Sequence, residues 1–397
     1  MKRKVIYVSV GRLTDKIARD WYIDYLIEKG VRVEYWDIVS LVREEHTERG
    51  ARNPEYLHVL RSFGEVEETL RLPENRDAIY VMLISYTGQL TQIFRLFSKY
   101  DRRLIFIAWG AMPRDPVYKW RKLASALANP AWYAKEIFYR CKATAQRRLK
   151  LVKPFDIIFA AGEALMAGGH FAAKVVPINL CDYDHYVKVR AKGGRLVEGR
   201  YSVFLDINLP YQSDLAFCGH PQIDPAAYFR SLNRFFGLLE REYEVRVVIA
   251  AHPKTDYDAA TFEGRPMHRL VTAELVRDAE FVLSHTSTAL SYAVLNAKPL
   301  VFIYTDGMAV AYRDTVIREM HCYASYLDSP IYNVDEITRG AQVAIAPVNP
   351  KSYERYKYDF LTTHESEETS TGEVFLREIS AIDAAEMNAA RRVSGTQ

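Results

Sequence analysis

The chain has 397 residues, of which 49% are apolar and 26% are charged, and its formal net charge is +3. This composition excludes a disordered or fibrous protein, and the length favours two domains of roughly 150 to 200 residues over a single core. The four cysteines form no CxxC pair, so neither a disulfide framework nor a zinc site is indicated, and a reducing, cytoplasmic compartment fits.

Nearly all-apolar strands alternate with helical stretches along the first half of the chain. Such strands are buried on both faces of a sheet, so the pattern predicts a doubly wound domain with a parallel sheet. A helical stretch is also expected around Glu55 to Leu72. The predicted strands occupy residues 4–11, 31–39, 78–86, 103–110 and 155–162.

The apolar pattern lapses into charges and glycines near residues 188–200, which indicates a linker. The alternation then restarts, with predicted strands at residues 201–209, 245–253, 280–285, 299–306 and 330–334. We therefore expect an α/β protein with two Rossmann-like doubly wound domains, residues 1–190 and 191–375, and a ligand cleft between them. Residues 376–397 are expected to form a helical tail that packs back on the first domain.

A basic and aromatic-rich segment lies between the last two predicted strands of the first domain. Residues 118–153 contain ten basic side chains and one acidic side chain, Glu136. Such a helical region can dock on anionic lipid headgroups, on the phosphates of a large acceptor or on nucleic acid. A solvated basic face over a core-facing stripe is the structural alternative. We favour peripheral contact with an anionic membrane or acceptor, and expect no nucleic acid because the chain is otherwise balanced in charge.

The strand "VRVVIAAHP" delivers His252 and Pro253, followed by Lys254, to the carboxyl edge of the second sheet, where α/β proteins bind ligands. A histidine there can donate to a phosphate or shuttle a proton, and Pro253 fixes the turn that aims it. A structural histidine is the alternative.

The strand "FVLSH" is followed at once by hydroxyl-rich residues, which begin a helix predicted at residues 286–297. Hydroxyls and orphan N–H groups at a helix start can hold a phosphate without a metal. An N-cap, for which one hydroxyl suffices, is the alternative. The hydroxyl residues are Ser284, Thr286, Ser287 and Thr288.

These two features, "AAHP" and then "SHTSTA" about 30 residues later, resemble the HP and paired-serine motifs of bacterial sialyltransferases with the GT-B fold. They also resemble those of related transferases of Kdo and other ulosonic acids that build capsules and O antigens. The resemblance covers mainly residues 200–305. It implies a CMP-activated ulosonic acid donor, read by the two motifs, and no metal cofactor. It also implies that the first domain binds the acceptor and the second binds the nucleotide sugar.

Two carboxylates are candidates for chemistry. Asp206, at the end of "VFLD", resembles the nucleophile of retaining GT-B β-Kdo transferases, and a turn-capping aspartate is the alternative. Glu163 follows the last predicted strand of the first domain and is expected to face Asp206 as an acid/base partner. A helix-start glutamate favoured by the dipole is the competing interpretation.

Further strand-end residues are positional candidates for the acceptor side: Gly11 with Arg12, Tyr86 to Gln89, and Trp109 with Gly110. The two DYD triplets, residues 182–184 and 256–258, mimic a metal motif. Both are expected in loops, where we interpret the likeness as coincidence.

The sequence thus predicts a glycosyltransferase that moves a CMP-linked ulosonic acid onto a bacterial surface glycan, with a lipid-linked glycan among the candidate acceptors. Two alternatives stay open. One is a GT-B-type polyol-phosphate transferase with a CDP-activated donor, and the other is a non-catalytic nucleotide- or sugar-binding protein.

Overall fold

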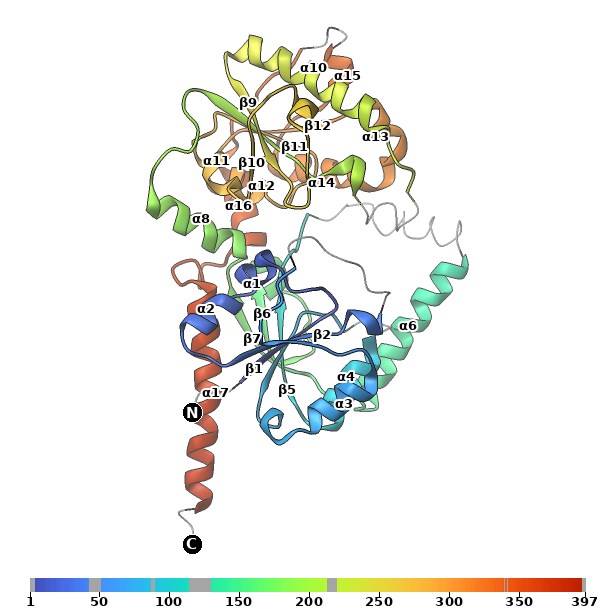
Figure 1. The fold of residues 1–397 in the computed structure, drawn as a ribbon, viewed down its shortest axis with the longest axis vertical. Coiled ribbons are helices and arrows are strands. Elements are labelled where there is room, and N and C mark those ends of the chain that lie inside the picture. The colour runs from blue at the N-terminus through green and yellow to red at the C-terminus, as the bar shows by residue number, and fades with distance from the viewer. Residues whose placement is uncertain are drawn as a thin grey trace. The chain divides into compact units, whose positions relative to one another are not determined.

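The computed structural model describes residues 4–42, 51–86, 90–113, 130–212, 220–338, 340 and 342–394. The chain divides into two compact units (Figure 1). Unit 1 comprises Met1–Gly110, Val117–Cys181 and Thr363–Gln397, and unit 2 comprises Ala111–Pro116 and Asp182–Thr362.

Unit 1 contains a seven-stranded parallel sheet with the order β3-β2-β1-β4-β5-β6-β7. Each strand predicted in this part of the sequence is present. Two edge strands, β3 and β7, were not predicted, and β3 begins the segment expected to be helical. The strands are β1 (Val5–Ser9), β2 (Val33–Asp37), β3 (Leu57–Val59), β4 (Ile79–Met82), β5 (Arg103–Ala108), β6 (Phe155–Ala161) and β7 (Ala172–Ile178).

Alternate residues of the central strands of unit 1 belong to two separate cores. Val5 and Tyr7 of β1 lie in one hydrophobic cluster, and Ile6 and Val8 lie in the other. Helices α1 (Asp15–Asp20), α2 (Ile23–Glu28) and α17 (Thr371–Ser394) contribute to the first cluster, and α3 (Phe63–Arg71) and α4 (Thr91–Lys99) to the second. The sheet is therefore covered on both faces, which explains its continuous apolar strands. Unit 1 also contains α6 (Pro130–Arg148), α7 (Glu163–Met166) and the 3₁₀ turns η1 (Val39–Leu41) and η2 (Pro73–Asn75).

The C-terminal helix α17 returns to unit 1. Phe375 packs edge-on against Phe159 of β6 with ring centroids 5.2 Å apart, and Lys174 pairs with Glu378 at 2.5 Å. The expected packing of the tail on the first domain is therefore confirmed. The returning segment begins at Thr363, ahead of the predicted residue 376, and the first boundary lies at Cys181/Asp182 because α8 (Cys181–Lys192) packs within unit 2.

Unit 2 contains a six-stranded parallel sheet with the order β10-β9-β8-β11-β12-β13. All five predicted strands are present, and the short edge strand β10 was not predicted. The strands are β8 (Tyr201–Leu205), β9 (Arg246–Ala251), β10 (Met267–Arg269), β11 (Val282–Ser284), β12 (Leu300–Tyr304) and β13 (Ile331–Asn333).

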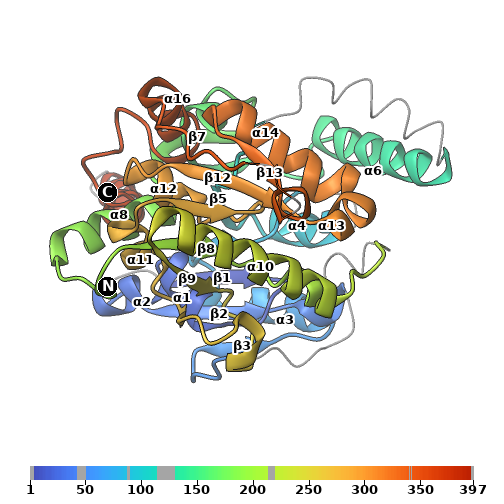
Figure 2. The same cartoon turned by 90° about the horizontal axis from the view of Figure 1, so that it is seen from above.

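Helix α10 (Pro225–Tyr243) lies over β8 and β9 (Figure 2), with Phe236 packed on Phe204 at a centroid distance of 5.3 Å. The other helices of unit 2 are α8, α11 (Thr272–Asp278), α12 (Leu290–Leu295), α13 (Asp306–Ala311), α14 (Arg318–Leu327), α15 (Val334–Thr338) and α16 (Pro350–Tyr356). Shorter turns are η4 (Leu209–Tyr211), η5 (Ala259–Phe262) and the π-helical η6 (Arg313–Ile317) and η7 (Lys357–Leu361).

In both sheets the strand order reverses beside the first strand of the unit, at β1/β4 and at β8/β11. This is the Rossmann-like order, in which ligands bind outside the carboxyl ends of the strands at the reversal. Two such units in tandem constitute the GT-B architecture, as the sequence predicted.

Candidate functional site

Asp206 joins the carboxyl ends of the neighbouring strands β8 and β9. Its Oδ2 accepts a hydrogen bond from the backbone N–H of His252 at 3.1 Å. Its Oδ1 accepts from the backbone N–H of Asn208 at 2.9 Å and from the Tyr257 hydroxyl at 3.2 Å. The residue is only 4% exposed. The carboxylate therefore holds both the turn after β8 and the turn after β9.

Burial raises the pKa of Asp206, and the N–H and O–H donors around it offset part of that rise. The turn-capping role, which the sequence left as the alternative, is present in these contacts. The three donors use most of the hydrogen-bonding capacity of the carboxylate. The role of Asp206 as a nucleophile stays a prediction.

His252 begins a tight turn at the end of β9. Its carbonyl accepts from the N–H of Thr255 at 3.0 Å and from the Thr255 hydroxyl at 2.7 Å. Its Nδ1 accepts from the backbone N–H of Lys254 at 3.2 Å, so the neutral imidazole carries its proton on Nε2. Such a ring can donate that proton to an anionic oxygen. Pro253 and Lys254 are exposed at the tip of the turn.

Tyr257 completes this group, and the sequence analysis missed it. Its hydroxyl contacts Asp206 and also the Asn208 side-chain oxygen at 3.3 Å, and its ring packs on Phe229 and Phe262. Burial, together with the negative charge of Asp206, raises the pKa of Tyr257, so the hydroxyl stays protonated as a donor. The only signal was the DYD triplet 256–258, which does lie in a loop as expected.

The hydroxyl-rich turn after β11 differs from the prediction. The helix α12 begins at Leu290, after a turn. Its N-cap residue is Ala289, whose side chain cannot cap the helix. Ser284 Oγ accepts from the N–H of Ser287 at 3.4 Å, and Ser287 Oγ accepts from the N–H of Ala289 at 3.3 Å. Two of the predicted phosphate ligands therefore stabilise the turn itself.

The other two predicted ligands in this turn, Thr286 and Thr288, are half-buried and exposed, respectively. The Thr288 carbonyl oxygen lies 3.1 Å from the Ser291 hydroxyl. The expectation that a helix starts directly at these hydroxyls was wrong, because a turn of several residues separates β11 from α12. Binding of a phosphate by this turn stays a prediction.

His285, inside the same motif, is a core residue. It is fully buried between the Tyr228 hydroxyl at 2.8 Å from Nε2 and the Ile303 carbonyl at 2.6 Å from Nδ1. Because a carbonyl can only accept, Nδ1 donates and Nε2 accepts from Tyr228. Burial lowers the pKa of His285 to about 4, so the ring is neutral near pH 7.

Glu163 is the first residue of α7, a single helical turn after β6, and its side chain is exposed. The preceding Gly162 has φ 81°, a conformation that favours glycine, and this turn sets the chain's entry into α7. The position matches the alternative interpretation of a glutamate at a helix start. Glu163 belongs to unit 1 and Asp206 to unit 2, and their pairing stays a prediction.

The first DYD triplet lies in the helix α8, not in a loop as expected. Asp182 accepts from the Ser291 hydroxyl at 2.5 Å and from the Tyr292 hydroxyl at 3.2 Å, while His185 Nδ1 lies 3.0 Å from the same Tyr292 oxygen. Since the single Tyr292 proton goes to Asp182, His185 donates. Asp182 thus joins α8 to α12. Within the described ranges, no group of three or more His, Cys, Asp or Glu side chains could hold a metal ion.

Tyr86, a positional candidate for the acceptor side, anchors α6 in the structure, and its role in acceptor binding stays a prediction. Its hydroxyl donates to Gln146 Oε1 at 3.0 Å, and Arg147 lies over its ring at 4.6 Å. Trp109 packs on Trp21 at 4.3 Å within unit 1, and the carbonyl of Gly11 accepts from Tyr35. The predicted residues 87–89 and 114–129 lie outside the described part of the chain.

No protein-family model matches the sequence, and a comparison with curated proteins finds no match. The chain is similar to several solved structures. They include the Methanocaldococcus jannaschii UDP-GlcNAc 2-epimerase in complex with UDP-GlcNAc and UDP, at 13% identity and a TM-score of 0.41, over 89% of this chain and 98% of the other.

A variant of the wall teichoic acid polymerase TagF is similar at 10% identity and a TM-score of 0.49, over 96% of this chain and 89% of the other. The glycotransferase of kitacinnamycin is similar at 12% identity and a TM-score of 0.46, over 99% of both chains. The two parallel sheets and their strand order define the fold of this chain.

Proposed function

We propose that this chain is a glycosyltransferase that moves a CMP-activated ulosonic acid, Kdo or a related sugar, onto a bacterial surface glycan. The observation that carries the proposal is the contact between Asp206 and the His252 turn at the carboxyl edge of unit 2. This edge lies beside the strand reversal β8/β11, the position at which doubly wound sheets bind nucleotides.

His252 would bind the donor phosphate. Because Nδ1 accepts the Lys254 N–H, the proton of the neutral ring is on Nε2, and this Nε2–H would be the donor to the phosphate. Lys254 adds a positive charge on the same turn. A proton donated to the phosphate stabilises the negative charge that develops on CMP as it leaves. Ser287 and Thr288, with Ser284 and Thr286, would contact the nucleotide. No metal is required by this chemistry.

Asp206 would be the nucleophile of a retaining double displacement. Its carboxylate attacks the anomeric carbon, and the bond from that carbon to the phosphate oxygen breaks with its electron pair leaving on CMP. An acceptor hydroxyl, deprotonated by Glu163, then attacks the same carbon and releases Asp206. The contacts of Asp206 also support a different role, in which it positions the His252 turn.

Thermal stabilisation by a panel of nucleotides, without added metal, tests the donor class. We expect selective stabilisation by CMP over CDP, UMP, UDP, GDP and ADP, and its loss in His252→Ala and Ser287→Ala. His321→Ala, which removes an exposed imidazole from α14, is the matched control and should behave like the wild type. A preference for CDP would favour the polyol-phosphate transferase, and nucleotide binding without turnover would favour a binding protein.

The role of Asp206 needs the isosteric Asp206→Asn, because this variant keeps the acceptor for the Asn208 N–H and the Tyr257 hydroxyl that Asp206→Ala removes. If Asp206 is the nucleophile, Asp206→Asn abolishes transfer while CMP still stabilises the protein. Substantial transfer by Asp206→Asn would exclude the nucleophile and leave the positioning role. The acid/base role of Glu163 predicts that Glu163→Gln slows transfer at unchanged CMP binding.

A further inference from the structure

Helix α6 exposes almost all of its surface. Among its described side chains only Gln146 is buried, whereas Ile137 is 47% and Phe138 is 62% exposed. Most helices in proteins are stabilised by burying one face against the rest of the fold rather than by helix propensity alone. The exposed apolar side chains of α6 therefore indicate a surface that another structure covers.

The C-terminal turns of α6 are anchored to unit 1. The Tyr86 hydroxyl contacts Gln146 Oε1 and the Ala143 carbonyl, at 3.0 and 3.3 Å. Arg147 lies over the rings of Tyr86 and Phe171, at 4.6 and 4.7 Å. Figure 1 shows these turns beside α4, with the N-terminal turns extending away from the sheet.

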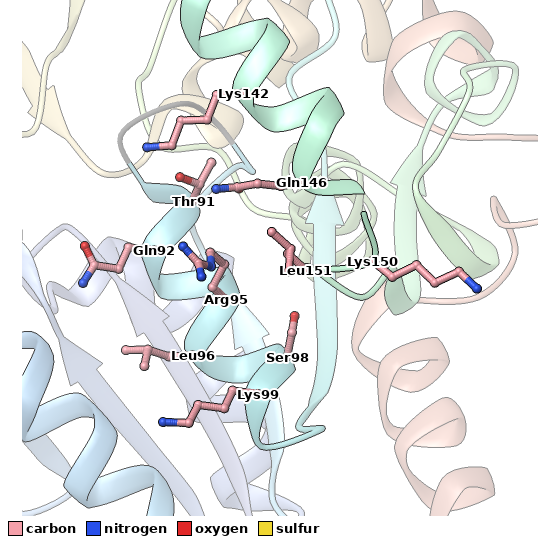
Figure 3. A pocket seen from close by; sticks show the side chains of 10 residues that line it. All are labelled: Thr91, Gln92, Arg95, Leu96, Ser98, Lys99, Lys142, Gln146, Lys150 and Leu151. Carbon is pink, nitrogen blue, oxygen red and sulfur yellow. The ribbon is translucent and has the colours of Figure 1, made fainter. Parts of the chain in front are cut away.

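A pocket of about 690 Å³ lies between α4 and the anchored end of α6. Figure 3 shows Lys142 and Gln146 from α6 facing Thr91 and Arg95 from α4 across it. Lys99 and Lys150 also line the pocket, and no acidic side chain does.

The positive charge of this pocket is not neutralised within the described part of the chain. Lys99 pairs with Glu67 at 2.6 Å, but no described acidic side chain forms an ion pair with Arg95, Lys142 or Lys150. Nearby Lys153, by contrast, pairs with both Asp101 and Asp156. Unpaired cations around a concave site favour an anion.

Apolar side chains continue the pocket at both ends. Phe138, Lys142 and Gln146 follow one another at intervals of four residues in α6, so Phe138 lies one turn along the helix face that lines the pocket. Leu151, 43% exposed, lines the opposite end. A phosphate group with attached acyl chains matches this arrangement, whereas a soluble sugar phosphate has nothing to place against Phe138.

We propose that α6 and the α4–α6 pocket form a docking surface for an anionic phospholipid bilayer. The pocket binds a lipid phosphate through Arg95 and Lys142, and Phe138 enters the interface between headgroups and acyl chains. Residues 118–153 were expected to contact an anionic membrane or acceptor, and α6 with its pocket specifies which side chains make that contact. Binding through this surface does not depend on the proposed transferase activity.

The test is cosedimentation of the full chain with vesicles of phosphatidylcholine alone or mixed with phosphatidylglycerol. We expect binding only to the mixed vesicles, and weaker binding at higher salt. Arg95→Gln/Lys142→Gln should weaken it about 30-fold, since each basic residue near an anionic surface contributes about 1 kcal/mol. Phe138→Ser should weaken it about tenfold, because burying a phenylalanine contributes about 1.5 kcal/mol.

Arg76→Gln/Lys188→Gln is the matched control, because it removes the same two charges from exposed positions outside the pocket. It should bind within about twofold of the wild type, since neither side chain belongs to α6 or lines the pocket. Equal binding by the wild type and the pocket variant, or no binding to mixed vesicles, would overturn the proposal. Glycerol phosphate that binds in an Arg95- and Lys142-dependent manner, without vesicle binding, would assign the pocket to a soluble ligand and also overturn it.

Discussion

Removing the carboxylate of Asp206 should destabilise unit 2 by an amount that its hydrogen bonds determine. In Asp206→Ala, the backbone N–H groups of His252 and Asn208 lose their acceptor, as does the Tyr257 hydroxyl. A buried donor left without a partner costs about 1–3 kcal/mol. Because His252 and Asn208 are only partly buried, water can reach some of these groups. We expect a loss of about 3–5 kcal/mol in the free energy of unfolding.

Asp206→Asn should cost less. The Oδ1 of the new asparagine can still accept hydrogen bonds from the Asn208 N–H and the Tyr257 hydroxyl. The oxygen that accepts from the His252 N–H is replaced by an amide nitrogen, which is itself a donor, so only this hydrogen bond is lost. One lost acceptor corresponds to about 1–3 kcal/mol. Asp224→Ala is the control, because Asp224 caps α10 through one exposed hydrogen bond to the N–H of Ala226 and its loss should cost about 1 kcal/mol.

Urea denaturation with two probes provides the assay. All five tryptophans, residues 21, 36, 109, 120 and 132, belong to unit 1, so tryptophan fluorescence reports that unit. Far-ultraviolet circular dichroism reports both units. Asp206→Ala should lower the dichroism midpoint more than the fluorescence midpoint. If it destabilises the protein no more than Asp224→Ala does, the inference that Asp206 holds the two turns together is refuted.

Three other outcomes are expected. Phe375→Ala should cost unit 1 about 3–5 kcal/mol, seen by tryptophan fluorescence, because this 1% exposed ring fills the core against Phe159; a loss below about 1 kcal/mol would contradict the packing of α17. Tyr228→Phe should cost about 1–3 kcal/mol in the dichroism transition, since His285 Nε2 loses its buried donor; an unchanged midpoint would argue against that bond. The pKa of His285 is about 4 in the folded chain and about 6.5 in an unfolded one, so the unfolded state binds the extra proton between these values. Stability should therefore be intact above about pH 6.5 and fall as the pH drops toward 4, and His285→Gln should flatten that profile if the assignment is correct.

The strands of the two sheets were predictable because burial on both faces leaves an unmistakable run of apolar residues. β1, β4 and β8 are buried at every position. The strands that were missed are edges: β3 has no buried residue, and β7 has only Val176 and Ile178 buried. An edge strand has a neighbouring strand on one side only and is less buried, so its own residues show a weaker apolar pattern.

The candidate site was predicted in part for the same reason. That His252 and Asp206 end strands could be read from the sequence, because both follow apolar runs. The hydrogen bond between Asp206 and the His252 turn could not be predicted from the sequence. The two residues are 46 positions apart, and they meet because β8 and β9 are neighbours. The start of α12 at Leu290 could not be predicted either, because a turn replaces the helix that was expected to begin at Thr286.

The sequence by itself determined the number of sheets, the parallel course of their strands and the residues at many strand ends, because local burial periodicity and turn residues are written along the chain. Tertiary structure alone decided which strand ends meet, that α17 crosses back to unit 1, and that Asp182 binds Ser291 across 109 residues. The physical reason is that a hydrogen bond between distant segments is selected by the packing of whole elements, which no local pattern of residues encodes.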